Sequence, residues 1–158
     1  MSGMRRVELA TLTACLIAGC DAPNGQNVRQ NVGIQMQAAN AAMQDAEYSE
    51  ALERFQEILS ADSNNVPAWL GTGQAYSELG EWQQAEPAFA EACRLSPASY
   101  EAQYGHGTSL QQLNRPAEAV GAYHRAMTID PLSSDASLGV GISYLQMDEP
   151  QHAKPFVE

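Results

Sequence analysis

The stretch LGTGQAY, residues 70–76, holds two glycines one residue apart. It recurs as YGHGTSL from Tyr104 and as LGVGISY from Leu138, so the glycine pairs return every 34 residues. A phosphate-binding loop occurs once, follows a strand and carries further glycines or a Gly-Lys-Ser/Thr ending, and this sequence has none of these features. A fixed period of this length is typical of a stacked repeat architecture.

Each 34-residue unit contains two blocks in which apolar residues recur at helical spacing, which predicts a pair of helices. A residue that tolerates left-handed backbone geometry stands between the blocks, where the first helix should end. These residues are Gly80, Asn114 and Asp148. A residue that favours helix N-caps stands where the next unit should begin. These residues are Asn65, Ser99 and Ser133.

Residues 66–99, VPAWLGTGQAYSELGEWQQAEPAFAEACRLSPAS, resemble the tetratricopeptide repeat (TPR). The residues that match the family pattern are Trp69, Gly73, Tyr76, Ala85, Phe89, Ala92 and Pro97. The resemblance implies an all-α fold, a right-handed α-solenoid of stacked helix hairpins. Three full repeats would be residues 32–65, 66–99 and 100–133, and a truncated fourth would be 134–158. Each hairpin has one apolar side that it cannot bury alone, and stacking buries it.

The two glycines of each pair have different explanations. By the resemblance, the second glycine lies where the two helices of a hairpin cross closely. The first glycine is less expected, because a glycine inside a helix costs about 0.8–1 kcal/mol relative to alanine. These first glycines are Gly71, Gly105 and Gly139. Two interpretations stay open for them: sequence drift at a tolerant position, or a bare groove floor that lets a ligand come close.

The first residues of the chain resemble the signal peptide of a bacterial lipoprotein. Arg5 and Arg6 precede a mostly apolar run over residues 9–18, which is too short to span a bilayer as a helix. The motif IAGC, which ends at Cys20, resembles the lipobox, and in that family a peptidase cuts before the cysteine. We therefore expect residues 1–19 to be removed and Cys20 to carry acyl chains that anchor the protein to a membrane.

The residues after the motif predict where the folded part is held. Residues 20–31 combine the lipidated cysteine with a polar segment that contains proline and glycine, and we expect a tether there. Asp21 resembles the enterobacterial signal for retention in the inner membrane. The expected location is the bacterial cell envelope, where the protein would be lipid-anchored and would face the periplasm.

The family resemblance also implies a concave groove that binds a protein or peptide partner. The groove positions of the family give one apolar row and a second row beside it. The residues in these rows are Met36, Leu70, Tyr104 and Leu138, then Asn40, Gln74, Thr108 and Ile142. Chaperone-binding members grip a C-terminal carboxylate with a basic clamp, but only Asn40 matches that clamp, and Glu101 stands where a lysine is required. We therefore expect a helix or extended segment with apolar anchors instead.

Composition argues against several function classes. The formal net charge is −11, whereas a nucleic-acid-binding protein is usually basic, so we expect no nucleic acid among the partners. Cys15, Cys20 and Cys93 have no metal-ligand spacing, and the three histidines match no catalytic motif. No nucleophile–base pair can be argued from spacing. We expect a protein that is not an enzyme and that has no catalytic residue, cofactor or metal site.

The favoured function is a membrane-anchored TPR scaffold or adaptor, for example in the assembly of an envelope complex, a pilus or a secretion pore. The alternative is the N-terminal recognition module of a larger polypeptide whose activity lies beyond residue 158. The fourth repeat motivates this alternative, because it lacks the later part of its second helix. Val140 and Tyr144 should then be partly bare. Three explanations stay open: further repeats cover this edge, a second copy of the chain covers it, or this end frays.

Overall fold

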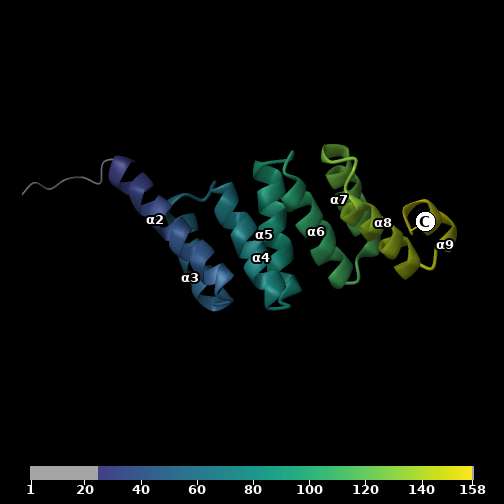
Figure 1. Ribbon diagram of the computed structural model, residues 1–158, viewed down its shortest axis with the longest axis horizontal. Helices are drawn as coiled ribbons and strands as arrows, with labels where there is room; N and C mark the ends of the chain where they lie inside the picture. Colours follow the sequence, from purple (N-terminus) through teal and green to yellow (C-terminus); the bar gives the residue numbers. More distant parts are fainter. Residues whose placement is uncertain (1–24, 158) are drawn as a thin grey trace, which may run out of the picture. The chain divides into compact units, whose positions relative to one another are not determined.

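A computed structural model describes residues 25–157 of the chain. Within these residues it contains eight α-helices and no strand, which confirms the predicted all-α class (Figure 1). The expected signal peptide, Cys20 and Asp21 lie outside the described residues. The chain divides into two units, residues 1–31 and 32–158, and the stacked hairpins described below belong to the second unit from residue 32 of α2 onward.

The helices follow one another as hairpins, each made of a first and a second helix (Figure 1). The hairpins are α2 (Gly25–Gln44) with α3 (Tyr48–Ala61), α4 (Val66–Glu78) with α5 (Trp82–Leu95), α6 (Tyr100–Gln112) with α7 (Pro116–Ile129), and α8 (Ser134–Gln146) with α9 (Pro150–Val157). Helices α3, α5 and α7 also pack against the first helix of the next hairpin, so the hairpins form the predicted solenoid. Helix α2 begins at Gly25, so residues 25–31 are helical where a tether was expected.

Side-chain caps fix the starts of three first helices. The side-chain oxygens of Asn65, Ser99 and Ser133 accept hydrogen bonds from the backbone N–H three residues later, at 3.1, 3.2 and 3.3 Å. Each bond satisfies one of the donors that a helix N-terminus leaves free. The three N-caps expected from the sequence are therefore confirmed.

A left-handed residue ends the first helix of every hairpin. Gly80, Asn114 and Asp148 have φ angles of 73°, 58° and 59°, as their residue types predict. Ala46 takes the same place in the first hairpin with φ of 59°. Alanine gives no sequence signal for this geometry, because its Cβ makes left-handed backbone unfavourable.

The core is built from alanines and one large ring in each of α3, α5 and α7. Helix α5 buries Ala85, Ala88, Phe89 and Ala92, and α7 buries Ala119, Ala122, Tyr123 and Ala126. Phe55 takes the same place in α3 and is 1% exposed. Small side chains let the helices approach closely, and the ring fills the space that remains between them.

Each ring lies against one or two of the periodic glycines. A Cβ atom added to Gly73, on the same hairpin as Phe89, would stand 2.8 Å from the Phe89 ring, and one added to Gly105, on the next hairpin, would stand 2.5 Å from it. These separations are shorter than side-chain carbons tolerate, so both positions exclude a side chain while the ring is in place. The Phe89 ring therefore occupies a slot between α4 and α6.

The same arrangement recurs along the stack and corrects both interpretations of the first glycines. A Cβ on Gly139 would stand 2.6 Å from the Tyr123 ring, and the Phe55 ring blocks Gly71 in the same way. Drift at a tolerant position is wrong, because a side chain there would overlap a buried ring. A bare groove floor is wrong for Gly71 and Gly139, which are buried, whereas Gly105 is half-buried and lines a pocket.

The last hairpin is closed more fully than the sequence predicts. Val140 of α8 is completely buried, in a cluster that includes Leu110 and Tyr123. Phe156 of α9 packs on the half-buried Tyr144, with ring centroids 6.2 Å apart. The expectation that Val140 would be partly bare is therefore wrong, because α7 and α9 both pack on α8.

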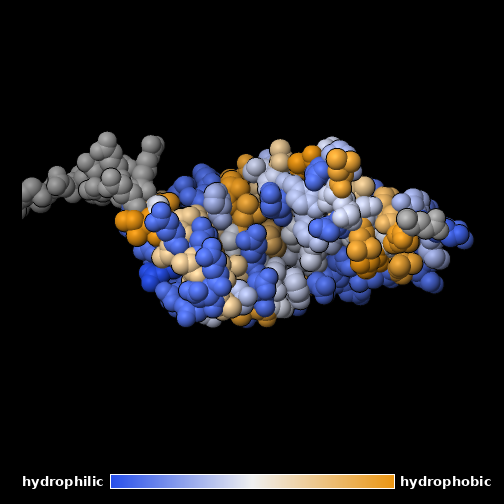
Figure 2. Space-filling view, viewed as in Figure 1, coloured by the Kyte–Doolittle hydropathy of each residue, from blue (hydrophilic) through white to orange (hydrophobic). Residues whose placement is uncertain are grey.

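One stripe of α8 nevertheless stays open to solvent. Leu138, Ile142 and Leu145 are 49%, 37% and 51% exposed, and their spacing places them on one side of the helix. Figure 2 shows apolar surface gathered at this end of the stack, over α8 and α9. Among the described residues no helix is both long enough and apolar enough to serve as a membrane span.

Candidate binding groove

The eight residues expected to line a groove all lie on first helices. On α2, α4 and α6 the first row is half-buried, and on α8 its last member, Leu138, is exposed. In the second row Asn40, Gln74 and Ile142 are exposed, and Thr108 is half-buried. Helix α6 packs directly on both α4 and α8, so these rows run across neighbouring helices.

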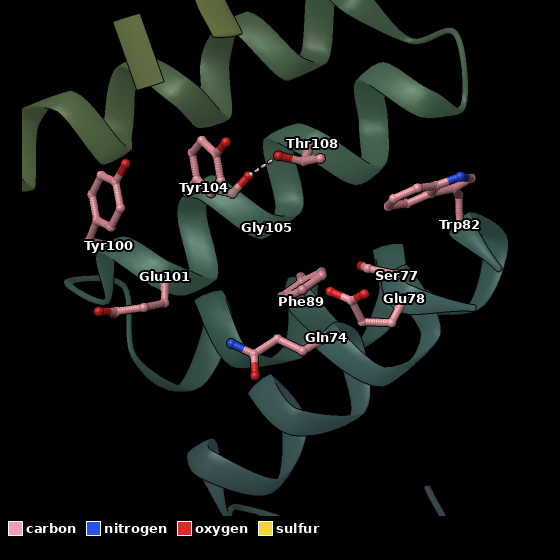
Figure 3. A pocket seen from close by; sticks show the side chains of 10 residues that line it. All are labelled: Gln74, Ser77, Glu78, Trp82, Phe89, Tyr100, Glu101, Tyr104, Gly105 and Thr108. Atoms are coloured by element: carbon pink, nitrogen blue, oxygen red, sulfur yellow. Dashed lines mark hydrogen bonds between the residues drawn. The ribbon is translucent and has the colours of Figure 1, made fainter. Parts of the chain in front are cut away.

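A pocket of about 380 Å³ opens between α4 and α6 at the middle of these rows (Figure 3). Its lining residues are Gln74, Ser77, Glu78, Trp82, Phe89, Tyr100, Glu101, Tyr104, Gly105 and Thr108. The structure thus brings together three of the expected groove residues, Gln74, Tyr104 and Thr108. Leu70, which we expected to act with Tyr104, does not line this pocket.

Aromatic rings form one wall and the floor of the pocket. Tyr100 and Tyr104, one helical turn apart on α6, stack with ring centroids 5.8 Å apart and planes inclined by 10°. The hydroxyl of Tyr100 is hydrogen-bonded to the cap residue Ser133, which holds the wall against the start of α8. The Phe89 ring forms the floor beside Gly105, and Figure 3 shows the Trp82 side chain at the opposite end from Tyr100.

Tyr123 supports this wall from behind. Its ring lies 5.8 Å from that of Tyr104, and its hydroxyl donates to Gln111 Oε1 at 2.8 Å, while Thr108 Oγ1 lies 3.3 Å from the same hydroxyl oxygen. Burial raises the pKa of Tyr123 to about 12. Thr108 in turn donates to the backbone carbonyl of Tyr104 at 3.1 Å. The Thr108 hydroxyl is therefore engaged within the protein, and Gln74 is the more accessible polar group of the second row.

The charged groups of the pocket are all acidic. Glu78 and Glu101 line it, and both are exposed. Glu78 accepts from the Tyr48 hydroxyl at 3.5 Å and Glu101 from Ser99 Oγ at 3.1 Å, which leaves both carboxylates able to take a further donor. Asp135, at the start of α8, is close enough to help raise the pKa of Tyr104, for which burial is the larger cause.

The basic side chains of residues 31–157 lie elsewhere. They are Arg54, Arg94, Arg115, Arg125 and Lys154, each in a second helix or directly before one. Arg115 is held by Glu118 at 2.7 Å and by Glu86 at 3.4 Å, and Arg125 donates to Gln103 at 2.9 Å. None of the five lines the pocket. The charged side chains that line the pocket are thus acidic, and none of the basic side chains of residues 31–157 reaches it.

Sequence reasoning missed Trp82, Tyr100 and Phe89 as pocket residues. Tyr100 precedes Tyr104 by four residues on the same helix, so its place on the same face was available from helical periodicity. Trp82 opens the second helix and Phe89 is a core residue, and neither belongs to the family's groove rows. Their shared pocket depends on how closely α4, α5 and α6 pack, which the spacing of residues does not give.

Comparison with known proteins agrees with this architecture. Residues 36–100 match the family model described as tetratricopeptide repeat. No curated protein matches the chain in sequence. Among solved structures, the crystal structure of MamA aligns over 94% of this chain and 79% of its own, with 20% identity and a TM-score of 0.76.

Two further TPR domains have a similar fold. The TPR domain of Arabidopsis OM64 aligns over 72% of this chain and 94% of its own, with 21% identity and a TM-score of 0.69. The first TPR domain of Spaghetti (RPAP3), solved with the HSP90 peptide SRMEEVD, aligns over 75% and 94%, with 20% identity and a TM-score of 0.73. Residues 32–157 therefore have the fold of a tetratricopeptide repeat solenoid, and residues 36–100 match the tetratricopeptide repeat family model.

Proposed function

We propose that this protein is a membrane-anchored TPR scaffold that holds a partner protein in the groove of its first helices. The observation that carries the proposal is the pocket between α4 and α6, where aromatic rings and two carboxylates lie open to solvent beside the expected groove residues. A cavity of about 380 Å³ with apolar walls and a few polar groups is typical of a site that takes a side chain or short segment.

The partner segment differs in chemistry from the peptide bound by the RPAP3 domain. That peptide, SRMEEVD, ends in acidic residues. In this chain the pocket presents Glu78 and Glu101 and none of the described basic side chains, so an acidic C-terminus would be repelled. The proposal therefore concerns an apolar or basic segment, and it assigns the chain no catalytic role.

The proposed location rests on the N-terminal sequence. Arg5 and Arg6, the short apolar run and the motif that ends at Cys20 together support lipidation at Cys20 and attachment to the bacterial cell envelope. Asp21 supports retention in the inner membrane, with the solenoid facing the periplasm. The scaffold would then act close to the membrane, for example where an envelope complex, a pilus or a secretion pore is assembled.

Capture of the partner with matched variants tests the proposal. The protein and its Leu70→Glu and Leu132→Glu variants are cross-linked in envelope fractions, and the captured proteins are quantified. Leu70→Glu places a charge in the groove row, and an interface anchor is worth about 1–3 kcal/mol, so its captured partner should fall strongly. Leu132 is 93% exposed in the loop before α8, so Leu132→Glu should capture as much as the unaltered protein. Equal loss in both variants, or no loss in either, would count against the groove.

The exposed stripe of Leu138, Ile142 and Leu145 supports a second contact, which we propose to be self-association at this edge. A contiguous apolar patch on a soluble domain usually marks an interface. Sedimentation equilibrium of the protein and of Leu145→Asp tests it. The unaltered protein should show a concentration-dependent increase in mass that the variant lacks, and identical monomeric behaviour of both would remove this contact from the proposal.

A further inference from the structure

The solenoid offers three equivalent steps between neighbouring first helices, and only the central one has two carboxylates and a stacked pair of aromatic rings. The steps lie between α2 and α4, between α4 and α6, and between α6 and α8. The floor of every step is built in the same way: a ring on a second helix lies against a glycine on the first helix of the following hairpin. The pairs are Phe55 with Gly71, Phe89 with Gly105, and Tyr123 with Gly139. The other residues at the positions of the central pocket differ from step to step.

In the step between α2 and α4, the two glutamates of the central pocket are replaced by Gln44 and Pro67, and the wall residues are Val66 and Leu70. In the step between α6 and α8, the glutamates are replaced by Gln112 and Asp135. The wall residues there are Ser134 and Leu138, and Pro116 stands in place of the tryptophan. In the step between α2 and α4, Tyr48 stands in place of the tryptophan. The two outer steps together therefore have a single carboxylate, Asp135, at these positions, and neither has two tyrosines on its wall.

The central step has Glu78 and Glu101 together with the indole of Trp82 and the stacked rings of Tyr100 and Tyr104. The faces of aromatic rings attract cations, and the attraction is strongest for tryptophan. A guanidinium group is planar and weakly hydrated, so it can stack on a ring while its N–H groups bond to a carboxylate. A lysine ammonium lacks this planar arrangement of N–H donors. A carboxylate on a ligand would be repelled by the two glutamates.

The net charge of the chain and the placement of its own cations favour the same partner. The formal net charge is −11, and the arginines nearest to α6, Arg115 and Arg125, are bound to side chains outside the pocket. Neither of them lines the pocket, so the described part of the chain supplies no cation to it. A cationic group in the pocket would therefore have to come from a bound molecule.

We propose that the pocket between α4 and α6 binds an arginine side chain carried by an extended basic segment of a partner protein. The guanidinium group stacks on the Tyr100–Tyr104 wall and donates to Glu78 and Glu101, while its aliphatic stem lies on Phe89 and Gly105. Apolar residues on either side of the arginine meet the outer steps, at Leu70 and at Leu138. This inference rests on the proposed function and names the chemistry of the partner.

Binding of capped tripeptides to the full chain tests the assignment. The probes are acetyl-Ala-Arg-Ala-amide, the same peptide with citrulline, which keeps the shape and removes the charge, and the same peptide with leucine. The indole N–H signal of Trp82 and the amide signal of Gly105 report on the pocket in two-dimensional NMR spectra. Half-saturation should need about fivefold less of the arginine peptide than of the citrulline peptide, which corresponds to about 1 kcal/mol of cation–π and ion-pair attraction.

Matched variants separate the pocket charge from the charge of the whole protein. Glu78→Gln and Glu101→Gln should each weaken binding of the arginine peptide about threefold, and the double variant about tenfold, because exposed ion pairs contribute modestly. Glu53→Gln removes an equal charge from an exposed residue of α3 outside the pocket and should leave binding unchanged. Moderate salt should reduce the preference for arginine, because it screens exposed charges.

Three results would overturn the inference. Equal binding of the arginine and citrulline peptides would show that charge is not recognised, as would unchanged binding by the double variant. Tighter binding of the leucine peptide at the same signals would replace the cationic partner with an apolar one and leave the proposed scaffold function standing. Absence of any shift at Trp82 and Gly105 with all three peptides would remove the pocket as an arginine site, whereas the capture experiment decides the scaffold function separately.

Discussion

The ring of Phe89 on α5 occupies the space that a side chain on Gly105 of α6 would need, since a Cβ there would stand 2.5 Å from it. Phe89 is 4% exposed, and its ring is packed between Gly73 of α4 and Gly105 of α6. The contact joins one hairpin to the next. The contribution of this contact to stability can be measured by placing a side chain at Gly105.

Gly105→Ala should lower the free energy of unfolding by about 1–3 kcal/mol, because the added methyl overpacks the buried ring. This loss outweighs the gain in helix propensity, which favours alanine over glycine by about 1 kcal/mol. Gly33 of α2 is the matched control, because an added Cβ there meets nothing within 4 Å. Urea unfolding should show Gly33→Ala to be neutral or stabilising, and a stabilising Gly105→Ala would refute the packing argument.

Ala46→Gly should raise the free energy of unfolding by about 0.5–1.5 kcal/mol. Ala46 has φ of 59°, and left-handed backbone costs an L-residue with a Cβ about 1–2 kcal/mol. Glycine adopts the left-handed geometry freely. Part of the gain in stability is lost, because glycine also raises the conformational entropy of the unfolded chain. Gly80→Ala, at the equivalent place in the second hairpin, should lose a similar amount. Thermal or urea unfolding checks both, and shifts of equal sign would contradict the argument.

Tyr123→Phe should make stability less sensitive to alkaline pH. Burial raises the pKa of Tyr123 from 10.0 to about 12, so the folded state holds the phenol proton more tightly than the unfolded chain. The stabilisation is fully present below pH 10 and is lost as pH rises through about 12. Phenylalanine fits the slot, since Phe89 fills the equivalent one, and it cannot ionise.

Urea unfolding near neutral pH and near pH 11 measures this effect. Near neutral pH the variant should be less stable by about 0.5–1.5 kcal/mol, because the hydrogen bond to Gln111 is lost. Near pH 11 this difference should shrink or reverse. A constant difference at both pH values would show that the titration of Tyr123 does not contribute.

Cys20→Ser should release the protein from the membrane fraction or leave its signal peptide uncleaved. The expectation follows from Arg5, Arg6 and the motif that ends at Cys20, since the thiol is the site of acylation in the lipoproteins that the sequence resembles. Cys15→Ser is the control, because that cysteine lies within the segment expected to be removed. Normal processing and membrane retention of Cys20→Ser would rule out the anchor.

The repeat frame could be predicted because each of its signals is local and returns every 34 residues. Asn65 and Ser99 cap helices through their own side chains, and Gly80 and Asn114 tolerate the left-handed backbone that ends a helix. Ala46 could not be predicted, because alanine does not favour the left-handed backbone that it adopts in the turn between α2 and α3.

The reason for the first glycines could not be predicted either. Gly71 and Gly139 accommodate rings from the preceding hairpin, so the explanation lies more than ten residues away in the chain and depends on the packing of α3 and α7. Part of the pocket lining could be predicted, because Tyr104 and Gln74 belong to the groove rows. Trp82 could not be predicted, because it reaches the pocket only through the turn from α4 to α5.

The slot around Phe89 also limits how repeats can be removed from this solenoid or inserted into it. A 34-residue unit looks interchangeable when it is read as a hairpin, yet its ring needs Gly73 from its own first helix and Gly105 from its successor. Separating this repeat from the next therefore removes Gly105 from the Phe89 ring, and the same holds for Phe55 with Gly71 and for Tyr123 with Gly139. A repeat transplanted into this stack must bring a glycine at its sixth position to receive its predecessor's ring, however well its own two helices fit together.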